Sequence, residues 1–326
     1  MDKLVKLRYW WFALSLIIII PGLISLGVFG LRLGIDFSGG ALWDLQFAER
    51  TPGQLDTERI RAIFAAQGFE GALVQLTESQ IDGRTVASAV VRTPSLSESD
   101  PETQRQQVLS ALSAEYGQVN QQALQTVGAT VSAESTRSAV IAVAAACVVI
   151  LIYLTLAFRR APHPVRYGVC AILAMIHDVL LVLGIASILG IAIGLEVDAL
   201  FLSALLTVIS FSVHDTIVVF DRIRENLINR RPTETFDDIV NHSIVQTLPR
   251  SVNTQLTTFF TLVALLLFGG ESIRNLVLIL LIGLISGTYS SIFNAAQLLV
   301  VWENREWKNW FRRNAPPGAE APHAAG

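Results

Sequence analysis

Long apolar runs dominate the hydropathy pattern of this chain. A helix needs about 20 predominantly apolar residues to cross a bilayer. Six segments meet that length: residues 10–31, 139–158, 167–189, 197–220, 248–269 and 273–302. The pattern therefore predicts six transmembrane helices, one before a long polar stretch and five after it.

The polar stretch between the first two runs has the shorter periods of a folded domain. Trp43, Leu45 and Phe47 alternate with polar residues, which is typical of a half-buried strand. The pattern then predicts a helix from Leu55 to Gly68, strands over residues 72–77 and 85–92 joined at Asp82-Gly83, a helix from Asp100-Pro101 to Tyr116, and a last strand over 122–131. This β-α-β-β-α-β order is the split, ferredoxin-like arrangement.

Composition supports a membrane protein. The chain of 326 residues is 52% hydrophobic and only 16% charged, whereas soluble domains carry about 25% charged residues. The fold class predicted is an α-helical membrane protein with six transmembrane helices and one α+β ferredoxin-like external domain. Six helices and one outer domain are typical of half of a parallel-repeat transporter.

The basic residues predict the orientation. Lysine occurs only at positions 3, 6 and 308, and arginines cluster at 159–166, 222–231 and 305–313. Because basic loops stay on the cytoplasmic side, both termini are expected there. The predicted parts are a cytoplasmic N-terminus (1–9), a first transmembrane helix (10–31), an external domain (32–137), a five-helix bundle (138–302) and a cytoplasmic tail with a disordered end (303–326).

Motifs for enzymatic chemistry are missing from the sequence. No lysine follows Gly39-Gly40 or Gly269-Gly270 as a phosphate-binding loop would require. Cys147 and Cys170 have no metal-ligand spacing, and both fall in apolar runs. We expect no catalytic group, metal site, cofactor or nucleic-acid partner, and the apolar run after Lys3 is too long for a typical signal peptide.

Asp215 is the main candidate for function, because it lies in the apolar run over residues 197–220. An ionisable group inside a bilayer costs roughly 2.5–3.5 kcal/mol and therefore needs a partner, water or a proton. Arg250 opens the next run from the same side, so an Asp215–Arg250 relationship is expected. The alternatives are a structural ion pair, or charges that reach the inner membrane surface.

Polar residues accompany both charges at helical spacing. Ser203, Thr207, Ser210 and His214 share one helix face, and Arg250, Thr254, Thr257 and Thr261 share another. Asp215, Arg250, Thr254 and His214 are the predicted ion-coupling residues. Thr207 and Ser210 fit either a hydrated path or contacts between helices.

A second His-Asp pair, His177-Asp178, lies in the third run, where a proton relay and a structural hydrogen bond both remain open. In the last run, Gly283 and Gly287 form a ridge of small residues, which predicts close packing on another helix. The ridge continues through Ser290, Ser291 and Asn294.

Several segments together resemble the SecF family of the bacterial SecD–SecF protein-export complex, within the resistance–nodulation–division superfamily. The matching segments are 34–40 (Gly-Ile-Asp-Phe-Ser-Gly-Gly), 214–226, 250–258, Gly269-Gly270 and 287–291, and they occur in order across residues 10–302. His214 departs from the family, which often has Asn there, so no fixed role for this position carries over.

The resemblance implies that the protein is an accessory subunit of the Sec translocase in the bacterial inner membrane. Such a subunit pairs with a SecD-like chain and acts after the SecA motor and the SecYEG channel. It uses the proton or sodium motive force to promote translocation of an unfolded preprotein, and the family's membrane-embedded Asp and Arg correspond to Asp215 and Arg250. The alternatives are a small-molecule exporter of the same superfamily, a non-transporting scaffold, and an intramembrane hydrolase using Asp178 and Asp215.

Overall fold

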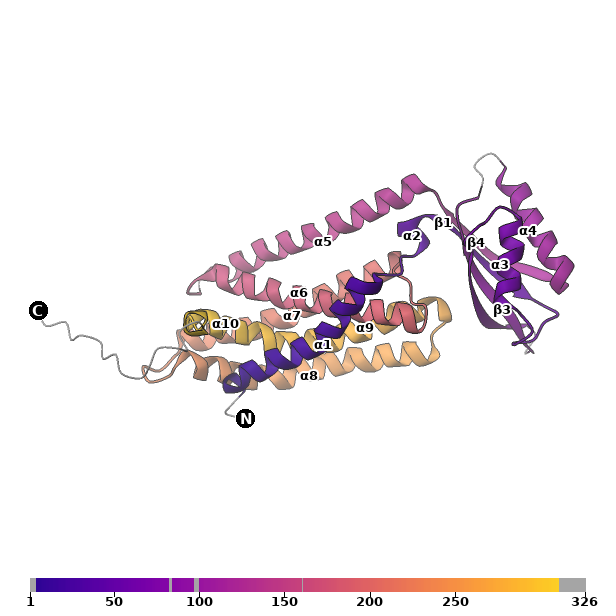
Figure 1. Cartoon of the computed structure of the whole chain (residues 1–326). Helices are drawn as coiled ribbons and strands as arrows, with labels where there is room; N and C mark the ends of the chain where they lie inside the picture. The colour runs from indigo at the N-terminus through magenta and orange to yellow at the C-terminus, as the bar shows by residue number, and fades with distance from the viewer. Residues whose placement is uncertain (1–3, 82–83, 97–99, 160, 311–326) are drawn as a thin grey trace, which may run out of the picture. The chain divides into compact units, whose positions relative to one another are not determined.

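The computed structural model describes residues 4–81, 84–96, 100–159 and 161–310. The chain divides into two compact units, one of residues 1–31, 143–195 and 200–326, and one of residues 32–142 and 196–199 (Figure 1). The turn predicted at Asp82-Gly83 and the end of the tail lie outside the described residues.

The larger unit is helical. Its helices are α1 (Arg8–Phe29), α6 (Pro164–Ala192), α7 (Ala199–Ile228), α8 (Phe236–Phe268) and α9 (Glu271–Ser290), and α5 (Ala129–Ala157) and α7 each have residues in both units. A short 3-10 turn, η1 (Val5–Leu7), precedes α1. A π-helical turn, η2 (Ser291–Ala295), joins α9 to α10 (Ala296–Glu303), and α11 (Trp307–Trp310) follows. In the described residues six helices are long and apolar enough to cross a membrane, which confirms the predicted six.

Two of these helices begin well before the apolar run that predicted them. α5 begins at Ala129 rather than near residue 139, and α8 begins at Phe236 rather than near 248. Hydropathy detects only the apolar part of a helix, whereas caps define its start. At α8 the Thr235 hydroxyl accepts from the Asp238 N–H at 3.2 Å and Asp238 accepts from the Thr235 N–H, forming a capping box.

Glycines allow the helices of the larger unit to approach closely. α1 contacts α6, and α9 contacts both α6 and α8. A Cβ on Gly22 would lie 2.8 Å from the Gly184 Cα, so only glycine fits this crossing. A Cβ on Gly283 would overlap the side chain of Val208 on α7, and one on Gly287 would lie 3.3 Å from the Ser212 Cα. The predicted packing of the glycine ridge on another helix is confirmed.

The smaller unit contains a four-stranded antiparallel sheet with the order β2-β3-β1-β4. Its elements are α2 (Ile35–Ser38), β1 (Gly40–Phe47), α3 (Thr57–Ala66), β2 (Leu73–Ile81), β3 (Arg84–Thr93), α4 (Pro101–Tyr116) and β4 (Val119–Val127). This is the predicted ferredoxin-like order. The last strand ends at Val127 rather than 131, because α5 already begins at Ala129.

Alternate side chains of β1 form the core of this sheet. Trp43, Leu45 and Phe47 are fully buried, as their alternation predicts. The Trp43 ring contacts Phe64 of α3 edge-on at 5.5 Å, and Phe47 contacts Tyr116 of α4 at 5.3 Å. Both helices therefore cover one face of the sheet (Figure 1).

The turn into β1 depends on Gly40. Its φ is +115°, and a Cβ there would lie 2.5 Å from the Thr93 carbonyl oxygen. Just before this turn, Asp36 of α2 accepts a hydrogen bond at 2.9 Å from the N–H of Ala199, the first residue of α7. The same unit contains an ion pair between Arg92 and Glu196 at 3.4 Å. Burial raises the pKa of Glu196, although Arg92 and Arg32 oppose that effect.

Candidate functional site

Asp215 lies in the second half of α7 and is 2% exposed. Its Oδ2 accepts a hydrogen bond from Nε2 of Gln255, which is 8% exposed on α8. The carboxyl group is thus held inside the bundle by a neutral amide. A buried carboxylate with this partner lacks the charge compensation that a guanidinium would provide.

Arg250 does not contact Asp215 in this structure. It is exposed, and among the described residues its side chain makes no hydrogen bond or ion pair. Arg250 and Gln255 are five positions apart on α8, which places them roughly 140° apart around the helix axis. The expected Asp215–Arg250 link is therefore absent here, because the buried face of α8 presents Gln255 to Asp215 instead.

The two predicted polar stripes both face away from the chain's own helices. Ser203, Thr207, Ser210 and His214 are exposed along α7, and Arg250, Thr254, Thr257 and Thr261 are exposed along α8. The Thr254 hydroxyl donates to the Arg250 carbonyl at 3.0 Å, and the Thr207 hydroxyl donates to the Ser203 carbonyl at 2.8 Å. In a bilayer, polar residues of this kind face protein or a water-filled cavity rather than lipid.

Asp178 has a different environment from that of Asp215. It is fully buried on α6, and its carboxylate accepts from three serine hydroxyls. Ser212 of α7 donates at 2.6 Å, and Ser286 and Ser290 of α9 donate at 2.6 and 2.5 Å. His177 Nδ1 lies 3.1 Å from the same carboxylate. These contacts join three helices, and hydrogen bonds from several donors are what a buried carboxylate needs.

The serine contacts connect Asp178 to the helix turn that carries Asp215. Ser212 precedes Asp215 by one turn of α7, so Asp178 holds the turn that carries Asp215. The Nε2 atom of His177 is buried without a hydrogen-bond partner in the described part of the chain. The His177 ring lies 6.5 Å from the Tyr289 ring. This geometry favours the structural alternative for Asp178 over the relay.

Sequence reasoning missed Gln255, Ser212 and Ser286, and it placed Ser290 only in a packing ridge. A signal was present, since each is a polar residue inside an apolar helix and Ser286 and Ser290 have i, i+4 spacing. Serine and threonine in membrane helices often bond only to their own backbone. The sequence does not show which helix lies opposite, so it cannot distinguish these residues from polar residues that bond only to their own backbone.

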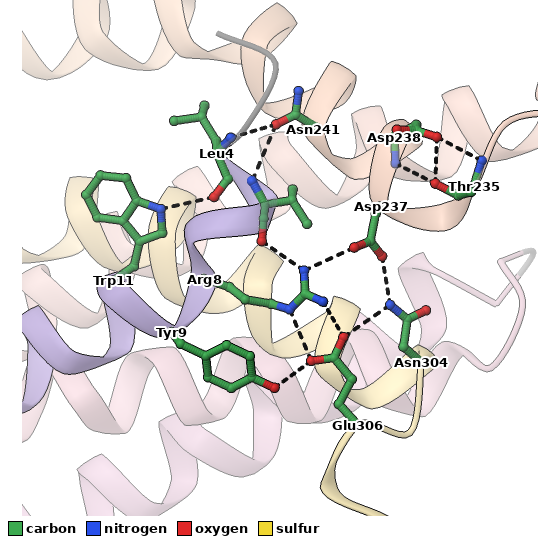
Figure 2. A network of polar contacts seen from close by, with 11 residues as sticks. Leu4, Arg8, Tyr9, Trp11, Thr235, Asp237, Asp238, Asn241, Asn304 and Glu306 are labelled. Carbon is green, nitrogen blue, oxygen red and sulfur yellow. Dashed lines mark hydrogen bonds and ion pairs between the residues drawn. The ribbon is translucent and has the colours of Figure 1, made fainter. Parts of the chain in front are cut away.

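A second polar network joins the ends of three helices of the larger unit (Figure 2). The Arg8 guanidinium contacts Asp237 at 3.0 Å and also bonds to Glu306. Further contacts are Tyr9 Oη to Glu306 at 2.6 Å, Asn304 Nδ2 to Asp237 at 2.7 Å, and the Leu4 N–H to Asn241 Oδ1 at 3.1 Å. Burial raises the pKa of Glu306, but the hydrogen bonds from Arg8 and Tyr9 outweigh this and hold that pKa below its ordinary value. The network anchors the start of α8, the helix that carries Gln255 and Arg250.

Two family models match this chain. Residues 107–305 match "Protein export membrane protein SecD/SecF, C-terminal", and residues 24–48 match the "SecD/SecF GG Motif". The protein translocase subunit SecF of Thermobaculum terrenum is 49% identical over 98% of this chain and 99% of its own length.

Longer proteins also match. The protein translocase subunit SecDF of Bacillus subtilis is 37% identical over 92% of this chain, which spans 38% of that protein. The crystal structure of SecDF, a translocon-associated membrane protein from Thermus thermophilus, matches with a TM-score of 0.77 and 34% identity. It covers 92% of this chain, which again spans 38% of it. The family model over more than half the residues and the relative that matches end to end agree with the six-helix fold. The chain is therefore a multi-pass membrane protein of the SecD/SecF protein-export family and corresponds to its SecF subunits.

Proposed function

We propose that this chain acts with a SecD-type partner and uses an ion gradient to promote movement of exported proteins through the SecYEG channel. One observation carries the ion-coupling part: Asp215 is buried in a membrane-spanning helix, and among the residues that the structure describes its carboxyl group is held by the amide of Gln255 alone. Such a carboxyl group can take up and release a proton with little rearrangement of fixed charges.

The mechanism uses two positions of Asp215. In the present position Gln255 holds the carboxyl group. In the second, the ionised group meets Arg250 and Thr254, which lie on the exposed stripe of α8. One charge crossing 100 mV releases about 2.3 kcal/mol, so a few charges per cycle are enough to drive a rearrangement of helices.

The exposed stripes on α7 and α8 support a partner chain in the membrane. Relatives named SecDF contain a segment like this chain within a longer protein. A SecD-type chain that covers the stripes would protect them from lipid and would complete the ion path. We place His214, Thr207 and Ser210 on that shared path.

The basic clusters support an orientation with both termini in the cytoplasm and residues 32–137 outside the bacterial inner membrane. The external domain would then meet the preprotein as it emerges. No chemical reaction is assigned to the chain. Asp178 and Asp215 accept hydrogen bonds from separate groups, whereas a hydrolase would need both carboxylates on one substrate.

Export driven by the proton or sodium gradient tests the proposal. In membrane vesicles that contain the whole translocase, Asp215→Asn and Arg250→Met should abolish the gradient-dependent part of preprotein export and leave the ATP-driven part unchanged. Thr258→Ala, on the same helix, serves as the control. Gradient-driven export at the wild-type rate in both variants would leave the scaffold alternative, and loss of small-molecule efflux without an export defect would favour the exporter.

A further inference from the structure

We propose that Gln255 is the positioning residue for Asp215: its amide keeps the Asp215 carboxyl group on the inner face of α8 and can bond to that group in either protonation state. This inference rests on the proposed ion-coupling role of Asp215. It adds a residue that sets when Asp215 becomes available to Arg250.

The contact is part of a ladder of polar contacts between α7 and α8. Asn226 Nδ2 of α7 donates to Ser243 Oγ of α8 at 2.8 Å, and Arg222 Nε donates to Gln246 Oε1 at 2.5 Å. The Asp215–Gln255 contact follows further along. The contacts run backward along α7 and forward along α8, as antiparallel helices require. Asn226 and Arg222 belong to the polar end of α7. Asp215 and Gln255 are buried, so their contact lies in the apolar part of the two helices.

An amide suits a group that changes its protonation state. A primary amide has two N–H donors and one carbonyl acceptor, whereas guanidinium has donors only. The Gln255 N–H groups can donate to the Asp215 carboxylate, and its carbonyl oxygen can accept from the carboxylic acid O–H. Arg250 can pair well only with the ionised form. Gln255 therefore holds Asp215 through a proton exchange, and Arg250 selects the ionised state.

The faces of α8 make these two partners exclusive. Gln255 is buried and Arg250 is exposed, and their five-residue spacing places them roughly 140° apart around the axis. Asp215 must leave the Gln255 amide before it can reach the stripe that carries Arg250. A weaker contact at position 255 would leave the carboxylate less stabilised in its buried position.

Carbodiimide labelling of Asp215 tests this directly, because the reagent modifies the protonated carboxyl group. The variants are Gln255→Met, which keeps a similar length but removes the amide, and Gln246→Met, which removes an amide from the same helix without touching Asp215. Adducts are measured by mass spectrometry on the full chain in membranes, with Asp215→Asn to assign the adduct. The rate at about pH 8 divided by that at about pH 5 cancels differences in reagent access, since both are measured on one variant.

The expected result is a ratio that rises about threefold or more in Gln255→Met and stays at the wild-type value in Gln246→Met, because a lost donor disfavours the charged form. Gln255→Glu provides a second test if the methionine variant does not fold. A nearby carboxylate also disfavours ionisation, so the ratio should again rise. Wild-type ratios in the folded position-255 variants, or an equal rise in Gln246→Met, would overturn the proposal.

Labelling requires no transport, which separates the two proposals. If the ratio responds to Gln255→Met while Asp215→Asn exports normally, Gln255 positions Asp215 but Asp215 does not couple ions to export. If Asp215→Asn abolishes gradient-driven export while the ratio does not respond, the coupling role holds and the role of Gln255 fails.

Discussion

Replacing Gly283 by alanine should force α7 and α9 apart. A Cβ on Gly283 would overlap Val208 Cγ2 and would lie 2.6 Å from Val208 Cγ1 and 2.9 Å from its Cβ. Real Cβ atoms essentially never come within 3.0 Å of a heavy atom outside their own residue and its chain neighbours. Because the Val208 Cβ itself is too close, a change of its rotamer cannot relieve the overlap, and the two helices must separate.

Overpacking of this kind costs about 1–3 kcal/mol. We expect Gly283→Ala to lower the unfolding temperature of the purified protein in detergent by a few degrees. Val208→Ala should be destabilising alone but should recover part of the lost stability in the double variant, since it removes both Cγ atoms and leaves only the Cβ contact at 2.9 Å. Gly27→Ala on α1 is the matched control, because nothing lies within 4 Å of its added Cβ.

The displacement should also reach the candidate site. Val208 lies two turns of α7 before Asp215, and Ser212, which donates to Asp178, lies between them. Gly283→Ala should therefore reduce gradient-driven export as well as stability, and Val208→Ala should partly rescue both. An unfolding temperature of Gly283→Ala equal to the wild type, or a double variant no more stable than Gly283→Ala, would refute the packing argument.

Three further predictions follow from individual contacts. Asp178→Ala should be severely destabilising, because three buried hydroxyls lose their acceptor at about 1–3 kcal/mol each. Ser286→Ala should cost only about 1 kcal/mol. Thermal unfolding measures both losses of stability, and equal losses would contradict the role of Asp178 as the acceptor that joins three helices. Asp178→Asn should retain gradient-driven export if the residue is structural. An export defect in a stable Asp178→Asn variant would instead support a proton relay through Asp178. Since the pKa of Glu306 lies below its ordinary value of 4.5, its stabilising contribution should be constant above that pH and lost as the pH falls below it. Unfolding temperatures measured from about pH 7 down to about pH 3 should show this loss in the wild type and not in Glu306→Gln, and parallel curves would contradict it.

Much of the fold follows from patterns along the chain. Six apolar runs predicted the six long helices, because a bilayer imposes a minimum apolar length. Alternation at Trp43, Leu45 and Phe47 predicted β1 and its buried face. The order of strands and helices between the first two runs predicted the ferredoxin-like sheet. The ends of helices were less predictable, since α5 and α8 extend into polar residues that hydropathy does not mark.

The candidate site was only partly predictable. Asp215 and Asp178 stood out because a carboxylate in an apolar run is costly wherever the helix packs. The residues that bond to these two carboxylates could not be recognised from the sequence. Gln255 and the serines at 212, 286 and 290 differ from ordinary polar residues of membrane helices only in what lies opposite them.

The amino-acid sequence by itself determined which segments span the membrane, which domain lies between the first two, and which charged groups require an explanation. These properties depend on local composition and period, which are present in every conformation of the chain. Only the tertiary structure decided that Asp215 bonds to Gln255 while Arg250 faces outward, and that Asp178 joins three helices. Those outcomes depend on how helices rotate and cross, and side chains separated by tens of residues, such as Asp215 and Gln255 or Val208 and Gly283, determine that rotation together.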